Sequence, residues 1–125
     1  MRELVKIDAV PTSILTVSLA TKGAGIVCVS RQMPRDLSTG LIPKYTKRQV
    51  KLSLSHCLKI LEAVGSSRDK VMIVWAYGTD LSIKPAVNAV FRNAFGAAPP
   101  SRNLVAVKDI GDNAAVEMSG LKLQD

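Results

Sequence analysis

Residues 46–77, TKRQVKLSLSHCLKILEAVGSSRDKVMIVWAY, contain the change of hydrophobic period that decides the expected fold. In the first part, apolar residues recur at spacings of three and four, which is the period of an amphipathic helix. We expect Thr46 to be the N-cap of this helix, Gln49 to complete a capping box and Gly65 to end it. Residues 71–77 are too few for a helix and rich in strand formers, so they predict an interior strand.

The stretch before this helix predicts three strands and a loop. The strand-like segments are residues 2–8, 14–20 and 26–30. Two glycines within residues 21–25 provide a tight turn, so we expect the second and third segments to form a hairpin. Residues 31–43 carry two prolines and a glycine, which indicates a loop.

The stretch after residue 77 predicts a second helix and two closing strands. Apolar residues trace a helical face from Ile83 to Phe95, Pro85 is tolerated in its first turn, and Gly96 stops it. The resulting order of strands and helices indicates an α+β domain with two helices on one face of a mixed sheet. No repeat or linker divides the chain, so residues 1–125 are expected to form a single domain.

A hairpin of the two closing strands would bring one arginine and one glutamate together. Residues 99–107 and 114–118 are strand-like, and residues 109–113 between them predict a turn. Arg102 lies near the start of the first arm and Glu117 on the second. A guanidinium grips a carboxylate in two places and a carboxylate can orient or deprotonate water, so the pair suggests a small-anion site. A structural salt bridge is the alternative, because ion pairs on sheets are common.

The composition favours a compact domain with anionic partners. The chain has 47% hydrophobic and 4% aromatic residues, a mean hydropathy of +0.19 and a formal net charge of +7. Charge alone does not choose among nucleic acids, acidic membranes and small carboxylates or phosphates. Aromatic residues for base stacking are scarce, so we do not expect a nucleic-acid partner. A solvated helix face better explains the densest basic group, which is Lys44, Lys47, Arg48 and Lys51.

The residues present argue against several kinds of site. No glycine-rich phosphate loop occurs, and the single histidine, His56, cannot build a His-rich metal site or a catalytic triad. Cys28 and Cys57 are isolated in sequence and read as buried thiols in a reducing compartment. The chain lacks an apolar signal core and the roughly 20 consecutive apolar residues of a membrane helix. We therefore expect a cytoplasmic protein without a metal or a membrane partner.

Short motifs along nearly the whole chain resemble those of a known family. They are residues 27–34 (VCVSRQMP) with Thr39-Gly40, Gln49, residues 60–67 (ILEAVGSS), residues 87–91 (VNAVF), residues 99–102 (PPSR) and residues 115–118 (AVEM). The chain resembles the reactive intermediate deaminases (RidA, also called YjgF), which hydrolyse imines and enamines released by pyridoxal-phosphate enzymes. The resemblance implies a chorismate-mutase-like (ferredoxin-like) α+β fold, assembled as a barrel-like homotrimer with clefts between subunits and without a cofactor.

The resemblance also implies roles for individual residues. Arg102 would hold the carboxylate of a small anionic substrate, and Glu117 would position the water that attacks the imine carbon. Ser30 and Asn88 fall within the matching motifs and are expected to contact the substrate. Addition of water would release ammonia and a keto acid.

The chain departs from the family pattern at the expected cleft. Val17 lines it where the family has a tyrosine, Arg31 stands where it has a glycine, and Ser119 where it has a second glutamate. In one hypothesis Arg31 is a second anion anchor of a specialised deaminase, whose substrate is larger than usual or carries two carboxylates. In the other, Arg31 fills the cleft of a non-catalytic ligand-binding or regulatory trimer. Arg31 pointing into an open cleft would favour the first hypothesis, and contact with Glu117 would favour the second.

Overall fold

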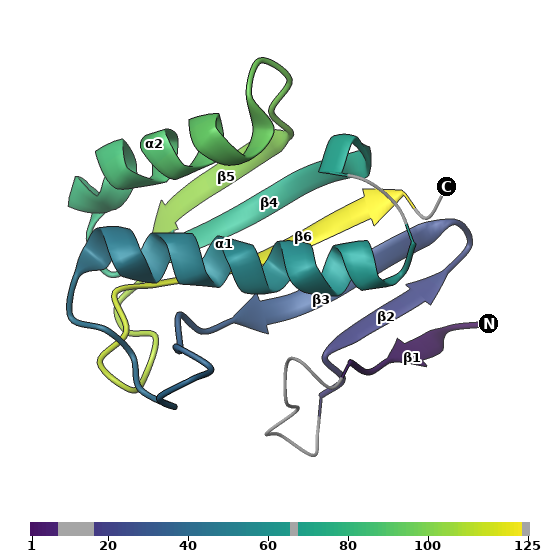
Figure 1. Cartoon of the computed structure of the whole chain (residues 1–125), viewed down its shortest axis with the longest axis horizontal. Coiled ribbons are helices and arrows are strands. Elements are labelled where there is room, and N and C mark those ends of the chain that lie inside the picture. Colours follow the sequence, from purple (N-terminus) through teal and green to yellow (C-terminus); the bar gives the residue numbers. More distant parts are fainter. Residues whose placement is uncertain (8–16, 66–67, 124–125) are drawn as a thin grey trace.

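One mixed sheet organises the computed structural model of the chain, which describes residues 1–7, 17–65 and 68–123 (Figure 1). Within these residues the strands lie in the order β1-β2-β3-β6-β4-β5. The strands are β1 (Glu3–Val5), β2 (Ala20–Gly23), β3 (Ile26–Gln32), β4 (Val71–Gly78), β5 (Ser101–Ala106) and β6 (Val116–Leu123). The helices are α1 (Thr46–Ala63) and α2 (Lys84–Phe95), with short 3-10 helices at Arg68–Lys70 and Leu81–Ile83. This order of elements confirms the predicted one.

Both helices pack on the same face of the sheet (Figure 1), which confirms the predicted α+β arrangement. The core between the two layers consists of aliphatic side chains, among them Val50 and Ile60 of α1, Val87 of α2, and Val74 and Met118 of the sheet. Alternate strand residues point to the opposite face, over which the described part of the chain places no helix. We call this opposite face the open face.

Helix α1 ends as predicted but begins differently. The N-cap is Tyr45, whose backbone is extended and whose side chain makes no capping hydrogen bond. Thr46 is the first helical residue, so the predicted Thr46 cap with its capping box is wrong. Gln49 turns inward instead: its Nε2 donates to the Pro43 carbonyl and its Oε1 accepts from the Ala115 N–H, both at 2.8 Å. The side chain therefore ties two chain segments to the helix.

Strands β2 and β3 form the predicted hairpin with a shifted turn. β2 begins at Ala20, and residues 14–16 of the expected strand lie outside the described residues. Ala24 and Gly25 have φ values of 50° and 76°, so they make a two-residue turn in which both residues are left-handed. Residues 21–23, expected in the turn, consequently extend β2 and pair with β3.

The predicted terminal hairpin of β5 and β6 is wrong. β5 is an edge strand that pairs in parallel with β4, whereas β6 lies between β3 and β4 and is antiparallel to both. The interior position saturates the backbone of β6 on both sides and buries Val116 and Met118 completely. Pairing with β5 at the edge would leave one side of β6 without a partner strand. The turn signal at residues 109–113 therefore belongs to a connection that crosses β4.

Candidate functional site

Arg102 and Glu117 point to opposite faces of the sheet. Arg102 is aligned with Val74 of β4, whose buried side chain faces the helices, so Arg102 also lies on the helical side. Glu117 is aligned with Tyr77, three positions further along β4 and hence on the open face. The two residues nominated from the sequence therefore do not meet within one chain.

Arg102 lies at the edge of the sheet against helix α2. Its Nη2 donates to Oδ1 of Asn88 at 2.9 Å, and its guanidinium lies 5.0 Å from the centre of the Phe91 ring. A hollow of about 390 Å³ opens here, lined by these three residues together with Arg92, Gly96, Pro99 and Pro100. A guanidinium has five N–H donors. Arg102, held over the Phe91 ring, can therefore bind a carboxylate while it keeps its hydrogen bond to Asn88.

Glu117 is buried on the open face beneath an arginine. Its side chain is 5% exposed, and its Oε1 lies 2.7 Å from Nη1 of Arg31, whose own side chain is 64% exposed. The contact is an ion pair whose geometry departs from that of an aligned hydrogen bond. This is the arrangement that we expected of a closed site.

Burial and the arginine act in opposite directions on Glu117. Desolvation raises the pKa of this carboxyl and is the larger effect, while the charge of Arg31 and its interaction with the carboxylate lower the pKa. The net pKa is above the ordinary value of a glutamate. A carboxylate with raised proton affinity is a better base for a water molecule than an exposed one.

Ser30 and Val17 line a hollow that includes neither Arg31 nor Glu117. The Ser30 hydroxyl donates to the Ser18 carbonyl at 2.7 Å, and Val17 is exposed. Both residues line an open hollow of about 360 Å³, which also involves Arg2 and Cys28. The structure thus joins Arg31 with Glu117 and Arg102 with Asn88, while Ser30 and Val17 line a separate hollow.

Sequence reasoning missed the aromatic partner of Arg102 and the buried polar side chains of α1. Phe91 follows Asn88 by one helical turn, so their shared face could have been found from the period. Gln49 was assigned to a cap, although its 4% exposure and its two partners place it inside the fold. A sequence pattern does not distinguish a polar side chain exposed to solvent from a buried one that hydrogen-bonds to the backbone of another chain segment.

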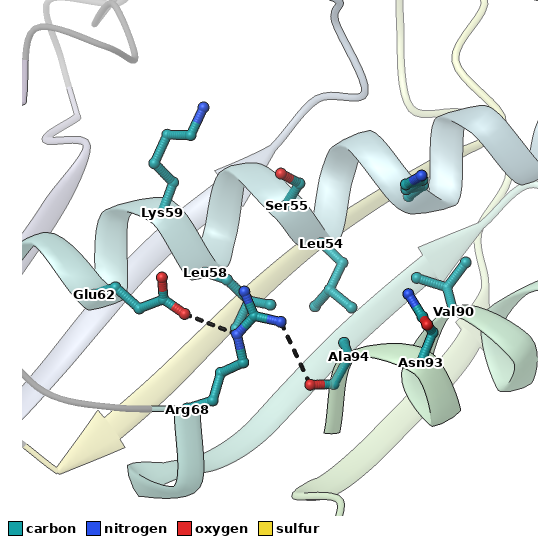
Figure 2. A pocket seen from close by; sticks show the side chains of 10 residues that line it. Leu54, Ser55, Leu58, Lys59, Glu62, Arg68, Val90, Asn93 and Ala94 are labelled. Carbon is teal, nitrogen blue, oxygen red and sulfur yellow. Dashed lines mark hydrogen bonds and ion pairs between the residues drawn. The ribbon is translucent and has the colours of Figure 1, made fainter. Parts of the chain in front are cut away.

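A groove between α1 and α2 contains none of the candidate residues (Figure 2). Arg68 closes one end, because its Nε lies 2.8 Å from Oε1 of Glu62 and its Nη1 donates to the Ala94 carbonyl at 3.4 Å. Lys59 and Ser55 line the side formed by α1. Because the groove lies on the helices and involves neither Arg102 nor Glu117, it is separate from the candidate site.

The remaining reactive side chains have structural surroundings. His56 is buried, with Nε2 2.6 Å from the Arg35 carbonyl oxygen. Burial strongly raises the pKa of the Cys57 thiol, so Cys57 is a poor nucleophile, whereas Cys28 is exposed and the prediction that it is buried is wrong. Among the described residues, no three His, Cys, Asp or Glu side chains are grouped to hold a metal ion, and no helix is long and apolar enough to cross a membrane.

A match to a protein-family model identifies the family of the chain. The model of the family Endoribonuclease L-PSP matches residues 8–122 of the chain. The chain belongs to this family, known as Rid, YjgF or RutC. The resemblance stated from the sequence motifs is therefore confirmed. A RutC family protein of Pyrococcus abyssi is 30% identical to this Rid protein, and the match covers 99% of this chain and 98% of that protein.

Solved structures agree with this membership. RidA from an Antarctic Psychrobacter species is 26% identical, with a TM-score of 0.89 over 97% of this chain and 98% of that one. TdcF of Escherichia coli, provisionally named a reactive intermediate deaminase, is 24% identical over 99% of this Rid protein and 98% of its own length. A crystal structure of TdcF with bound serine matches with a TM-score of 0.90, covers 98% of this chain and 99% of that one, and at 23% identity shows the common fold alone.

Proposed function

We propose that this Rid protein is a hydrolytic deaminase of imines and enamines of small carboxylic acids. The observation that carries the proposal is Glu117, a buried carboxyl with a raised pKa on the sheet face that no helix of the described residues covers. Arg102, held by Asn88 and Phe91, supplies a separate anion anchor. TdcF, a relative with bound serine, is consistent with a ligand of amino-acid size.

The active unit that we propose is a homotrimer with clefts between subunits. Arg102 and Glu117 lie on opposite faces of one chain, so a second copy is needed to bring an Arg102 to a Glu117. The open face supports this assembly, because Ile26, Val105 and Leu123 point to it and are 38%, 44% and 44% exposed. Apolar side chains gathered on one face favour burial against another copy.

In the proposed reaction, Arg102 binds the substrate carboxylate, which places the adjacent C=N carbon in the cleft. An enamine first tautomerises to the imine. Glu117 of the neighbouring subunit orients a water whose oxygen bonds to this carbon, and the water protons pass to nitrogen. The C–N bond of the carbinolamine then breaks, leaving a keto acid and ammonia. No electrons are exchanged with another reactant, so the protein side chains suffice.

Arg31 must release Glu117 before Glu117 can orient water. The Arg31 side chain is 64% exposed, so its guanidinium can leave Glu117 for solvent or for a carboxylate of the substrate. A second carboxylate on the substrate would replace Glu117 as the partner of Arg31. We therefore propose that dicarboxylic or larger imines are preferred over the smallest monocarboxylic ones.

A ligand-binding or regulatory trimer without catalysis is the second candidate. The Arg31–Glu117 ion pair favours it, since the 2.7 Å contact occupies the group that would otherwise hold water. We do not propose ribonuclease activity, although the family description names it. The only histidine, His56, is buried against the Arg35 carbonyl and is not available for acid–base cleavage of RNA.

An imine-loss assay tests the proposed activity. Purified protein is added to an amino-acid oxidase or dehydratase reaction, and decay of the imine is followed for monocarboxylic and dicarboxylic substrates. We expect the wild type to accelerate decay and Arg102→Ala to lose at least about tenfold of the acceleration, because one charge-assisted anchor is removed. Arg48→Ala is the matched control and should retain activity, because Arg48 pairs with Asp36 and lines neither candidate group. If the wild type accelerates none of these reactions, the deaminase proposal is wrong and the binding trimer remains.

A further inference from the structure

Strand β3 contains a bulge at the residues that meet Glu117. Val29 pairs with Gly120 and Gln32 with Met118, so three steps along β3 correspond to two steps along β6. Because of the extra residue, Ser30 and Arg31 of β3 both lie opposite the single β6 residue between Gly120 and Met118. A bulge re-aims side chains and removes backbone groups from the ladder, which must then find other partners.

Two side chains on the helical side of the sheet bind the displaced backbone. Gln32 Nε2 donates to the Ser30 carbonyl at 3.0 Å, within the bulge itself. The hydroxyl of Ser53, in the middle of α1, donates to the Gln32 carbonyl at 2.6 Å. Ser53 is fully buried, so its hydroxyl has no solvent alternative, and serine has no advantage as an interior helix residue. Its position is thus explained by the bulge that it binds.

The same row of α1 binds the backbone on both sides of Glu117. Gln49 accepts from the Ala115 N–H at 2.8 Å, and the Cys57 thiol donates to the Met118 carbonyl at 3.0 Å. Gln49, Ser53 and Cys57 are spaced by four residues and therefore share one helix face. One face of α1 consequently fixes the β3 bulge relative to β6, while Arg31 and Glu117 meet on the far side of the sheet.

We propose that Ser53 is a positioning residue, whose hydrogen bond to the Gln32 carbonyl holds the bulge that brings Arg31 to Glu117. Ser53 touches neither side chain and acts only through the β3 backbone. An effect of Ser53 on turnover depends on the proposed function, but an effect of Ser53 on the Arg31–Glu117 ion pair does not. A measurement of the Glu117 carboxyl therefore tests the inference even if the protein is not a deaminase.

The test is the pKa of Glu117, followed by carboxyl-carbon NMR in the full-length protein. Arg31 of β3 is the charged group that contacts Glu117, and Tyr77 of β4 is the titratable group aligned with it. Arg31→Ala should raise this pKa by on the order of 1 unit, because an opposite charge is lost. Ser53→Ala should raise it in the same direction by a smaller amount, and Ser53→Thr, which keeps the hydroxyl, should restore it.

A second set of variants separates positioning from a general loss of structure. With Arg31→Ala already present, Ser53→Ala should shift the pKa of Glu117 no further. Ser55→Ala, on the groove side of the same helix, should leave the pKa unchanged (Figure 2). Gln32→Ala reaches the bulge from β3 and should act like Ser53→Ala if replacements at the buried position 53 do not fold. The inference is overturned if Ser53→Ala and Gln32→Ala leave the pKa unchanged, or shift it equally with and without Arg31.

Discussion

Burial and Arg31 have opposite effects on the pKa of the Glu117 carboxyl. Burial favours the neutral carboxyl, and the guanidinium at 2.7 Å favours the charged one. Because burial is the larger effect, the folded protein holds the Glu117 proton more tightly than the unfolded chain does. The contribution of this shift to stability is therefore present below the ordinary pKa of a glutamate and is lost as pH rises through the raised pKa.

Replacing Arg31 should steepen this pH dependence. Arg31→Ala raises the pKa of Glu117 further, so the fall in unfolding free energy between about pH 4 and pH 7 should grow by about 0.5–1 kcal/mol, a value reduced for the exposure of Arg31. Urea denaturation across this range measures it. Arg35→Ala is the control, because Arg35 pairs with the exposed Asp112. An equal loss of stability at both ends of the range would show that Arg31 does not stabilise the Glu117 charge.

Helix α1 shows both the reach and the limit of prediction from the sequence. Its apolar period predicted the helix and its buried face, since that period follows directly from helical geometry. The function of Gln49 could not be predicted, because a capping glutamine and a glutamine that binds Pro43 and Ala115 occupy the same sequence position. The distinction depends on which loops the finished fold brings against the helix.

Two substitutions in α1 distinguish a capping role of Thr46 from the binding of the Pro43 and Ala115 backbone by Gln49. Gln49→Ala should destabilise the protein by about 1–3 kcal/mol, because the Ala115 N–H and the Pro43 carbonyl lose their partner. Thr46→Ala should cost less than about 0.5 kcal/mol, since Thr46 makes no cap, whereas loss of a true cap costs about 1 kcal/mol. Denaturant unfolding measures both. A larger cost for Thr46→Ala than for Gln49→Ala would restore the capping-box interpretation.

The closing strands show why the candidate site could be predicted only in part. Arg102 and Glu117 were nominated by the chemistry of their side chains and by family motifs, which do not depend on strand order. Their proximity was inferred from a hairpin, and the sheet instead inserts β6 between β3 and β4. Local turn residues do not encode this choice, because strand partners are selected by how much of each strand the whole fold buries.

The whole molecule has one covered and one open sheet face, and the candidate residues are divided between them. Arg102 with Asn88 lies on the helical side at the β5 edge, and Glu117 with Arg31 lies on the open face. In the proposed trimer, exposed apolar side chains on the open face would provide the area for contact with another copy. The central claim of the proposed function is that a complete cleft combines one group from each of two copies.

Complementation between two inactive variants tests this claim directly. Arg102→Ala and Glu117→Gln chains, each inactive alone in the imine-loss assay, are co-expressed and purified as mixed assemblies. If each cleft takes Arg102 from one copy and Glu117 from the next, random mixing leaves about a quarter of the clefts intact, and activity should return to about a quarter of the wild-type value. Mixed assemblies no more active than either variant alone would contradict a cleft shared between subunits.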